Sequence, residues 1–551
     1  MASTMTSLIN HNFGGIRRKD SIFSEDKITC SDCQNIELYY TELNSAVGIR
    51  TAKGNVAVNN LIPDNEKVIG LFESRQNNVL YYFVYTETDS IGKLYNFDID
   101  NSSITQLTTF TNATGKAQGE NFKQGYTDVF VFSNGEQIKF IYTNTEVPTR
   151  PIVVANEEPS DYPAAKKLTV SLTDNLSRTV KGLGIANIYG RLWVFDDKTL
   201  WWSKSENIAD FYNNQSDTTL VTRAGYIEFS KSITAIHEYL GSLAVFHKDS
   251  SSLVVETNET SPLFKATDES PGGCASYDSL VFHGTDLFFY DDTKKGVYSF
   301  QQVINGDKTL GDNIAYDIQD ELMSINKNDL YKIRALSVVT SDRNEVWFLT
   351  PIETTYEVKA FNEQEEIITV TKKGSIILIY DYIRGEWVKR KCQEINSIAV
   401  LNSVLFSGGE QVYQEYTSNY FNGDYIQHYY ICTIMNLGTD NTLKITKFAP
   451  RITIDSSQIN HFYVKYVKNY NLSKKPKVKE LSTKLSGNIL VYDSGDTYDS
   501  GKTYKPGGVS GIIKIPSATF KALEITFYTT DRNQFFTIKA IEFSKIKVKQ
   551  I

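Results

Sequence analysis

The chain has few of the residues that build covalent scaffolds or metal sites: 5 cysteines, 6 histidines and 4 methionines in 551 residues. So few cysteines exclude a disulfide framework. No apolar run approaches the roughly 20 residues of a membrane-spanning helix, so no membrane span is expected. The first residues carry no apolar stretch typical of a secretory signal, so none is predicted.

Aromatic residues are abundant, with 34 Tyr, 30 Phe and 5 Trp, whereas proline is limited to 12. A hydrophobic content of 41% is enough to form a core, which excludes an intrinsically disordered chain. Aromatic residues are favoured on half-buried strands. The composition therefore predicts a large, β-rich protein.

Charge is distributed unevenly along the chain. Residues 441–551 hold 19 Lys and Arg against 8 Asp and Glu, a net charge of +11. The first 440 residues hold 38 against 57, a net charge of −19. Such an asymmetry indicates two bodies with different surroundings, although drift in a lysine-rich proteome would give the same pattern.

A repeated pattern of short strands fills the first part of the chain. A short apolar strand, a turn rich in Gly, Asn or Ser, and a second apolar-aromatic strand recur at steps of 44 to 61 residues. Central positions of the seven second strands are Leu80, Val131, Leu192, Leu243, Leu287, Val346 and Leu405. This period predicts an irregular β-propeller of six or seven blades, with a set of stacked sandwiches as the alternative.

The predicted fold class is all-β: a propeller over residues 35–423, preceded by an N-terminal arm (1–34) and followed by a basic β-sandwich (424–551). One amphipathic helix is expected between blades, because Ile314, Ile318, Leu322 and Ile325 form a single stripe. A short helical turn is expected at 205–211. The alternation of apolar residues and lysine at the C-terminus is typical of a protected edge strand.

No catalytic, cofactor or metal site is predicted. The segment 495–503 resembles a phosphate-binding loop, but its glycines are spaced incorrectly and Pro506 excludes a following helix. Cys30 and Cys33 have the spacing of a zinc knuckle without two further ligands nearby, which favours free thiols. The chain is therefore predicted not to be an enzyme.

Two carboxylate pairs, 196–197 and 291–292, could in principle serve a glycosidase. Each pair occupies the turn after a second strand, where Asp supports the turn by bonding its own backbone. Trp193, Trp201 and Trp202 could stack on sugars or bases. Because they recur within a blade pattern, packing between blades is the favoured interpretation.

The chain resembles the tail nozzle proteins of short-tailed bacteriophages, also described as tail tubular or packaged-DNA stabilisation proteins. The resemblance lies in four segments: 12–54 with its Gly-Gly motif, 190–211, 379–387, and 492–504, where Tyr504 replaces a common tryptophan. Its signature positions are packing residues: Gly190, Arg191, Leu192, Trp193, Trp201, Trp202 and Trp387.

The resemblance implies a structural virion protein, assembled in the host cytoplasm and located in the tail. A homo-oligomeric ring, expected to be a hexamer, would form a tube below the portal and adaptor, retaining packaged DNA and conducting it during ejection. Implied partners are adaptor or portal-side rings, distal tail proteins and, transiently and without sequence specificity, genomic double-stranded DNA.

An acidic propeller suits a passage through which DNA slides, since each Lys or Arg contact to phosphate adds affinity. The basic sandwich suits docking on an acidic neighbour, and Lys474, Lys475, Lys477 and Lys479 are its candidate docking or DNA contacts. The alternative function is a glycan-binding tail propeller for attachment to the host surface.

Overall fold

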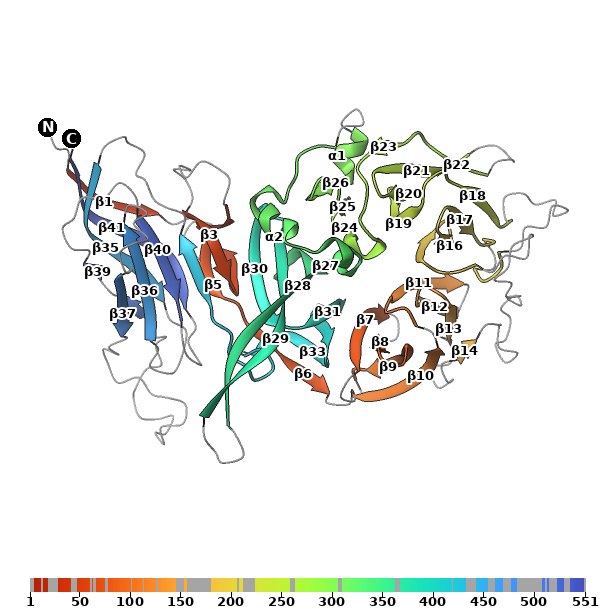
Figure 1. Cartoon of the computed structure of the whole chain (residues 1–551), viewed down its shortest axis with the longest axis horizontal. Helices are drawn as coiled ribbons and strands as arrows, with labels where there is room; N and C mark the ends of the chain where they lie inside the picture. The colour runs from red at the N-terminus through yellow and green to blue at the C-terminus, as the bar shows by residue number, and fades with distance from the viewer. Residues whose placement is uncertain are drawn as a thin grey trace.

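The computed structural model is an all-β protein with a ring of seven small sheets beside two larger ones (Figure 1). It describes residues 4–10, 13–17, 28–40, 47–59, 62, 66–74, 78–100, 102–111, 113–124, 127–144, 153–155, 180–205, 208–211, 223–257, 263–305, 310–361, 367–418, 420–432, 442–453, 461–468, 477–482, 508–510, 513–514, 523–529 and 536–549.

The first four blades of the ring each consist of strands in sequence order. Blade 1 contains β7 (Lys67–Ser74), β8 (Val79–Thr86), β9 (Ile91–Asp98) and β10 (Ser103–Thr111). Blade 2 contains β11 (Gln118–Gln124), β12 (Thr127–Ser133), β13 (Ile138–Asn144) and β14 (Val153–Ala155). Blade 3 contains β15 (Gly184–Ile188), β16 (Arg191–Asp196), β17 (Thr199–Trp202) and β18 (Gly225–Glu228). Blade 4 contains β19 (Ile233–Tyr239), β20 (Ser242–His247), β21 (Ser250–Glu256), β22 (Phe264–Ala266) and β23 (Ser270–Pro271).

The last three blades are less regular. Blade 5 has three strands, β24 (Leu280–His283), β25 (Asp286–Asp291) and β26 (Gly296–Ser299). Blade 6 contains β27 (Arg334–Val339), the long β28 (Asn344–Phe361) and β29 (Ile367–Asp381), and β30 (Glu386–Gln393). Blade 7 joins β31 (Ile395–Leu401), β32 (Val404–Gly409) and β33 (Val412–Ser418) to β6 (Gly54–Asn59), which comes from the start of the chain.

The predicted propeller is confirmed by this topology, and it has seven blades. All seven second-strand positions selected from the sequence lie on the second strand of a blade. The first strands of the blades contact one another in a closed circle, β7 to β11, β15, β19, β24, β27, β31 and back to β7. Separate hydrophobic clusters fill the spaces between successive blades, so the aromatic content found in the sequence holds the ring together.

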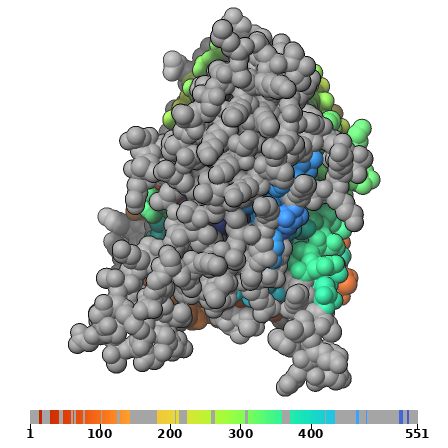
Figure 2. Space-filling model, turned by 90° about the vertical axis from the view of Figure 1, so that its left-hand side faces the viewer, coloured from red at the N-terminus to blue at the C-terminus, as the bar shows by residue number. Residues whose placement is uncertain are grey.

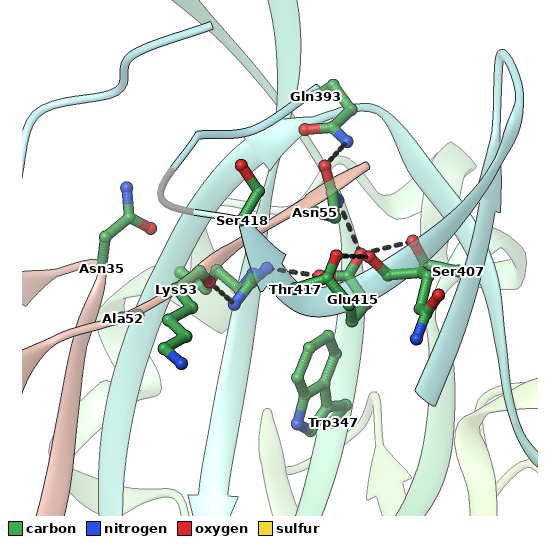
Figure 3. A network of polar contacts seen from close by, with 12 residues as sticks. Asn35, Ala52, Lys53, Asn55, Trp347, Gln393, Ser407, Glu415, Thr417 and Ser418 are labelled. Atoms are coloured by element: carbon green, nitrogen blue, oxygen red, sulfur yellow. Dashed lines mark hydrogen bonds and ion pairs between the residues drawn. The ribbon is translucent and has the colours of Figure 1, made fainter. Parts of the chain in front are cut away.

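Closure of the ring depends on β6, which pairs antiparallel with β33 although the two strands lie about 360 residues apart. Buried polar contacts surround this junction (Figure 3). Asn55 on β6 donates its amide hydrogen to Glu415 at 2.7 Å and accepts one from Gln393 at 2.6 Å. Glu415 also forms an ion pair with Arg390, whose side chain is 2% exposed.

The Arg390 guanidinium is enclosed by aromatic rings, 4.9 Å from the ring centres of both Tyr416 and Phe421 and 5.4 Å from that of Trp347. A buried charge is tolerated when it is paired and hydrogen-bonded, and removing one partner typically costs about 3–5 kcal/mol. This network therefore links blade 6, blade 7 and the closing strand into one unit.

The two larger sheets form a sandwich built from both ends of the chain. One contains β4 (Ile36–Tyr40), β5 (Val47–Thr51), β41 (Thr537–Lys549), β35 (Thr442–Thr453), β38 (Gly508–Ser510), β39 (Ile513–Lys514) and β1 (Thr4–Asn10). The other contains β2 (Phe13–Ile16), β3 (Ile28–Gln34), β34 (Tyr429–Cys432), β40 (Leu523–Tyr528), β36 (His461–Lys468) and β37 (Lys477–Ser482).

The structure therefore differs from the predicted division into an arm (1–34), a propeller (35–423) and a sandwich (424–551). Strands β1 to β5 pair within the sandwich, and the propeller begins at β6, inserted between β5 and β34. Sequence periodicity is local and does not reveal pairs such as Cys30 with Cys432. The chain ends lie together at the sandwich (Figure 1).

The C-terminal strand β41 also differs from the expected edge strand. It pairs with β35 on one side and with β5 and β1 on the other. The partner β1 is more than 500 residues away in sequence, so the alternation in the C-terminal segment alone could not reveal that its outer side is covered.

Sandwich and blade 6 share one hydrophobic cluster, which includes Phe13, Ile49 and Tyr430 from the sandwich and Trp347 and Trp387 from the blade. Viewed from the sandwich end, described residues of the sandwich in blue and of blade 6 in green reach the same face (Figure 2). The shared core joins the sandwich to the propeller without a separate linker.

Helices are short in the described part of the chain, and none there is long or apolar enough to cross a membrane. The predicted amphipathic segment becomes a 3₁₀ turn (Tyr316–Ile318) followed by α2 (Gln319–Met323), inserted between blades 5 and 6. A further 3₁₀ segment covers Lys327–Lys332, another covers Tyr277–Ser279, and α1 covers Phe300–Asn305. The described residues of 205–211 form turns and a bridge instead of the expected helical turn.

Candidate functional site

The signature residues of the sequence analysis lie mainly in blade 3. Gly190 occupies the turn between β15 and β16 with a φ of +65°, and Leu192 is fully buried. Arg191 is 3% exposed and donates hydrogen bonds to the carbonyl oxygens of Ser203 at 2.6 Å and Arg223 at 3.0 Å. Arg191 therefore stabilises its own blade through these hydrogen bonds.

The tryptophans of blade 3 are buried on both sides of the blade. Trp193 and Trp202 lie 5.2 Å apart between ring centres and pack edge-on against Phe264 of blade 4. Trp201 belongs to the cluster between blades 2 and 3, together with Phe140. The exposed fraction of each of the three tryptophans is at most 6%, so none of their rings offers a free face to a sugar or a base.

Trp387 lies where blade 6 meets the sandwich. Its indole N–H donates to the Ile314 carbonyl at 2.7 Å. The Gly-Gly motif of β2 runs directly beside its backbone, and a Cβ on Gly15 would lie 2.2 Å from the Trp387 carbonyl oxygen. The backbone N–H of Gly15 donates to Glu386 at 3.1 Å. Glycine is required here for close approach of two strands, one from each body.

The carboxylate pairs are turn residues in the structure. Asp291 accepts hydrogen bonds from the backbone N–H groups of Thr293, Lys294 and Gly273, and Asp292 pairs with Lys295. Asp197 adopts a φ of +49° in the corresponding turn of blade 3. This use of both oxygens of Asp291 leaves no pair of open carboxylates at the turn of blade 5.

The fold brings Cys30, Cys33 and Cys432 together on adjacent strands of the sandwich. All are buried free thiols, and burial raises the pKa of Cys30 and of Cys432. A raised pKa disfavours the thiolate that binds metals. Within the described residues there is no group of three or more His, Cys, Asp or Glu placed to hold a metal.

Lys477 and Lys479 lie on β37, the edge strand of the six-stranded sandwich sheet. In register they stand opposite Tyr466 and Val464, which are buried, whereas Val478 between them is 51% exposed. The role of Lys477 and Lys479 as docking or DNA contacts stays a prediction. Lys474, Lys475 and the segment 495–503 lie outside the described residues.

The propeller axis is bridged by polar side chains. Arg334 of blade 6 donates to the Ile69 carbonyl of blade 1 and lies 3.8 Å from the Asp278 carboxylate. Tyr277, just before blade 5, donates to the Ile185 carbonyl of blade 3 at 2.6 Å. Hydrogen bonds between blades that are not neighbours mean that side chains occupy the axis at this level.

The most distinctive surface feature is the outer half of the β28–β29 hairpin, here called the ribbon (residues 353–361 and 367–375). Its two strands pair only with each other up to Gly374, where β30 joins. Figure 1 shows the ribbon projecting beyond the ring and the sandwich. Five residues beyond Tyr356 correspond to a reach of about 17 Å, since a strand rises about 3.4 Å per residue.

A polar anchor fixes the base of the ribbon to the body. Lys372 forms an ion pair with Asp424 at 2.7 Å, and the Tyr356 hydroxyl donates to the same carboxylate at 3.3 Å. Beyond this anchor, Ala360 pairs with Ile368 on one face and Lys359 with Thr369 on the other. The sequence analysis missed the ribbon, although its long alternation of β-branched residues is a signal for an extended hairpin.

No family model matches the chain, and neither does any curated protein. Among solved structures, one match is a chain of the "Mitotic Checkpoint Complex", with 10% identity, a TM-score of 0.35, and coverage of 64% of this chain and 92% of that one. Another is Sqt1 of Saccharomyces cerevisiae, with 9% identity, a TM-score of 0.35, and coverage of 66% and 98%.

A third match is a quinonprotein alcohol dehydrogenase-like protein of Bacteroides thetaiotaomicron, with 12% identity, a TM-score of 0.31, and coverage of 64% and 69%. Scores this low say nothing about function. The seven-bladed propeller is defined by the sheet topology of the chain.

Proposed function

We propose that the protein is a non-catalytic structural subunit of the tail of a short-tailed bacteriophage, assembled in the host cytoplasm into the virion. Copies of the chain, expected to number six, form a nozzle below the portal and adaptor that retains packaged DNA and conducts it during ejection. The resemblance of the sequence to tail nozzle proteins supports the biological setting.

The single observation that carries the architectural role is the ribbon. A two-stranded ribbon on its own is marginally stable in water and gains stability when it packs against another surface. The hairpin segment 353–373, counted with the connecting residues 362–366 that carry three of its Glu, contains five Glu against three Lys, and the sandwich segment 441–551 has a net charge of +11. Charge complementarity therefore favours docking of the ribbon on the sandwich of a neighbouring copy.

The path of DNA follows from the bridged axis. Because Arg334 and Tyr277 bridge blades across part of the central channel, the proposal places the duplex in the tube enclosed by the copies and not along the axis of one propeller. The net charge of −19 on the first 440 residues suits the lining of such a tube, since repulsion keeps counterions on the DNA.

The experiment compares two neighbouring ribbon positions that lie on opposite faces, Ile368→Glu and Thr369→Glu. Both variants add one negative charge, so a difference in ring assembly between them reports the contribution of the apolar face alone. We expect the wild-type protein and Thr369→Glu to form rings in electron micrographs and in mass photometry. Ile368→Glu is expected to remain monomeric with an unchanged melting temperature, because a buried unpaired carboxylate opposes docking.

Two results would overturn the proposal. One is a wild-type protein that stays monomeric at high concentration and also when mixed with its adaptor ring. The other is ring formation by Ile368→Glu at the wild-type concentration dependence.

A further inference from the structure

A cleft lies between blades 5 and 6, at the end of β29 that is opposite to the ribbon. Its volume is about 360 Å³, within the range of roughly 300–1,000 Å³ that is common for small-molecule sites. The cleft is open to solvent on one side and is formed by β25, β26, α1 and the end of β29. Nothing in the proposed architectural role requires a cavity here.

One wall of the cleft is aromatic. Tyr380 and Tyr382 are half-buried and lie against Phe288, at 6.2 and 5.9 Å between ring centres. Tyr382 is held from behind by an edge-on contact with His283 at 4.9 Å. Tyr380 also packs against Trp387 at 5.0 Å between ring centres, so both tyrosine rings are held in place by aromatic neighbours where they line the cleft.

The facing wall is polar and uncharged. It is formed by Gln301, Gln302 and Asn305 on α1, all exposed. An amide side chain offers both donors and an acceptor, so it matches a hydroxyl group in either role. These amides stand on a helix that is itself firmly held in place.

Buried polar groups at the cleft floor position that helix. Asp286 is 5% exposed and accepts hydrogen bonds from the backbone N–H groups of Leu287 at 2.7 Å and Gln301 at 2.8 Å, and from the Ser299 hydroxyl. Burial raises the pKa of Asp286 in spite of these bonds. Its oxygens are thus committed to the protein, and the carboxylate serves as a support for α1.

Among the described residues that line the cleft, none is Lys or Arg. Phosphates, nucleotides and acidic sugars therefore find no counter-charge, and bidentate recognition of an anion is absent from this set. An aromatic platform opposite amide groups suits a neutral ligand that presents an apolar face on one side and several hydroxyl groups on the other. Neutral saccharides have this chemistry.

We propose that the cleft between blades 5 and 6 binds a neutral saccharide, stacked on Tyr380 and Tyr382 and hydrogen-bonded by Gln301, Gln302 and Asn305. The saccharide can be a free oligosaccharide or the exposed end of a cell-surface polysaccharide, since both present the same groups. A single shallow site of this kind is expected to bind weakly, with a Kd of about 1 mM.

The test is saturation-transfer NMR on the full-length protein with glucose, galactose, mannose, N-acetylglucosamine and their disaccharides, each at about 20 mM, well above the expected Kd. Glucuronate serves as the acidic counterpart. The variants are Tyr382→Ala, Tyr382→Phe and Gln301→Ala, with Tyr331→Ala as the matched control, because Tyr331 is 56% exposed on a different element.

We expect at least one neutral sugar to bind the wild-type protein and the Tyr331→Ala control. Binding should weaken at least about tenfold in Tyr382→Ala and in Gln301→Ala, equivalent to about 1.4 kcal/mol. Tyr382→Phe keeps the aromatic ring and should retain sugar binding. Loss of binding in Tyr382→Ala but not in Tyr382→Phe then assigns the effect to the ring. Gln301→Ala alters only an exposed side chain and gives a second readout on a folded protein.

The proposal is overturned if no neutral sugar binds, if binding is equal in Gln301→Ala and wild type, or if glucuronate binds best. Binding of short apolar peptides in the same cleft, in place of sugars, would also overturn it. Binding to whole host cells distinguishes a cell-surface polysaccharide from a free oligosaccharide. If the ligand is on the cell surface, Tyr382→Ala should lower binding to cells as well as binding to sugars.

Discussion

Single residues in this protein stabilise it mainly by filling the spaces between blades. Trp193 is fully buried and contacts Trp202 of its own blade and Phe264 of the next. Its indole N–H donates a hydrogen bond to the Ile188 carbonyl oxygen at 3.2 Å. A side chain that satisfies its polar atom and contacts two blades contributes to ring stability and has no free surface for a ligand.

Replacing Trp193 by Ala should lower the free energy of unfolding by about 3–5 kcal/mol, as large-to-small core changes do. Chemical denaturation followed by circular dichroism measures this loss, and Tyr226→Ala, which removes an aromatic ring that is 41% exposed in the same blade, is the control. A Trp193→Ala variant with wild-type stability that loses affinity for a sugar or DNA would favour the stacking interpretation.

His428 is a second residue whose burial has a measurable consequence. It lies between propeller and sandwich, and its Nε2 contacts the Ala52 carbonyl at 3.3 Å. Burial is the main cause that lowers the pKa of His428 from 6.5 to about 4. The folded protein therefore keeps this ring neutral where the unfolded chain would already take up a proton.

Because the folded-state pKa lies below the unfolded value, the contribution of His428 to stability is complete above pH 6.5. It is lost as the pH falls from 6.5 toward 4, by up to about 3 kcal/mol at 1.36 kcal/mol per pKa unit. Urea unfolding between pH 7.5 and 4 should show this slope, reduced in His428→Gln. An equal slope in both proteins would contradict the assignment.

At the scale of elements, the contact between β2 and β30 joins the two bodies. The Gly-Gly motif allows β2 to lie directly on the Trp387 backbone, and Arg17 reaches Glu386 at 3.5 Å. In the sequence, the motif belongs to the family resemblance, which by itself assigns it no physical role. Its role is steric, because the neighbouring atoms at Gly15 are backbone and have little freedom to move.

Gly15→Ala is expected to destabilise the protein by about 3 kcal/mol, at the upper end of overpacking effects. Gly14→Ala is the matched control, since the nearest atom to its added Cβ would be the Thr29 methyl group at 3.1 Å, a side-chain atom that can shift. Differential scanning calorimetry of the two variants tests the difference. Equal melting temperatures would show that β2 can be displaced from blade 6 at little cost.

At the scale of the whole molecule, the charge distribution governs contact with nucleic acid. A neutral or acidic surface binds duplex DNA only weakly, whereas each Lys or Arg placed on a phosphate adds salt-dependent affinity. The first 440 residues are acidic, and the basic segment follows them. Part of the sandwich is formed by residues 4–51. A truncation near residue 423 would therefore remove β34 and β41, the C-terminal strands with which β3 and β5 pair.

The intact protein should bind duplex DNA weakly, with a Kd of about 10⁻⁴–10⁻⁶ M that rises with salt. Filter binding at low salt measures it. Lys474→Gln with Lys475→Gln should weaken binding further, whereas Lys198→Gln with Lys248→Gln, on exposed positions of the propeller, should not. Tight binding that depends on the propeller lysines would contradict an acidic passage.

Much of the architecture is present in the sequence as local pattern. The spacing of apolar-aromatic strands around Leu80, Leu192 and Leu287 predicted the propeller, because each blade is a local hairpin with its own turn signals. Asp291 and Asp197 were recognisable as turn residues for the same reason. Such features depend on neighbours within a few residues, and the sequence displays these directly.

Only the tertiary structure decided how the ends of the chain are used. The strand pairings of β6 with β33, of β3 with β34 (at Cys30 and Cys432) and of β1 with β41 join segments hundreds of residues apart, so no local period in the sequence signals them. The cleft beside Tyr382 is likewise assembled from two blades and α1. Long-range strand pairing and surface shape arise from how local units pack, and this is why the sequence alone left the domain boundary and the candidate binding site undetermined.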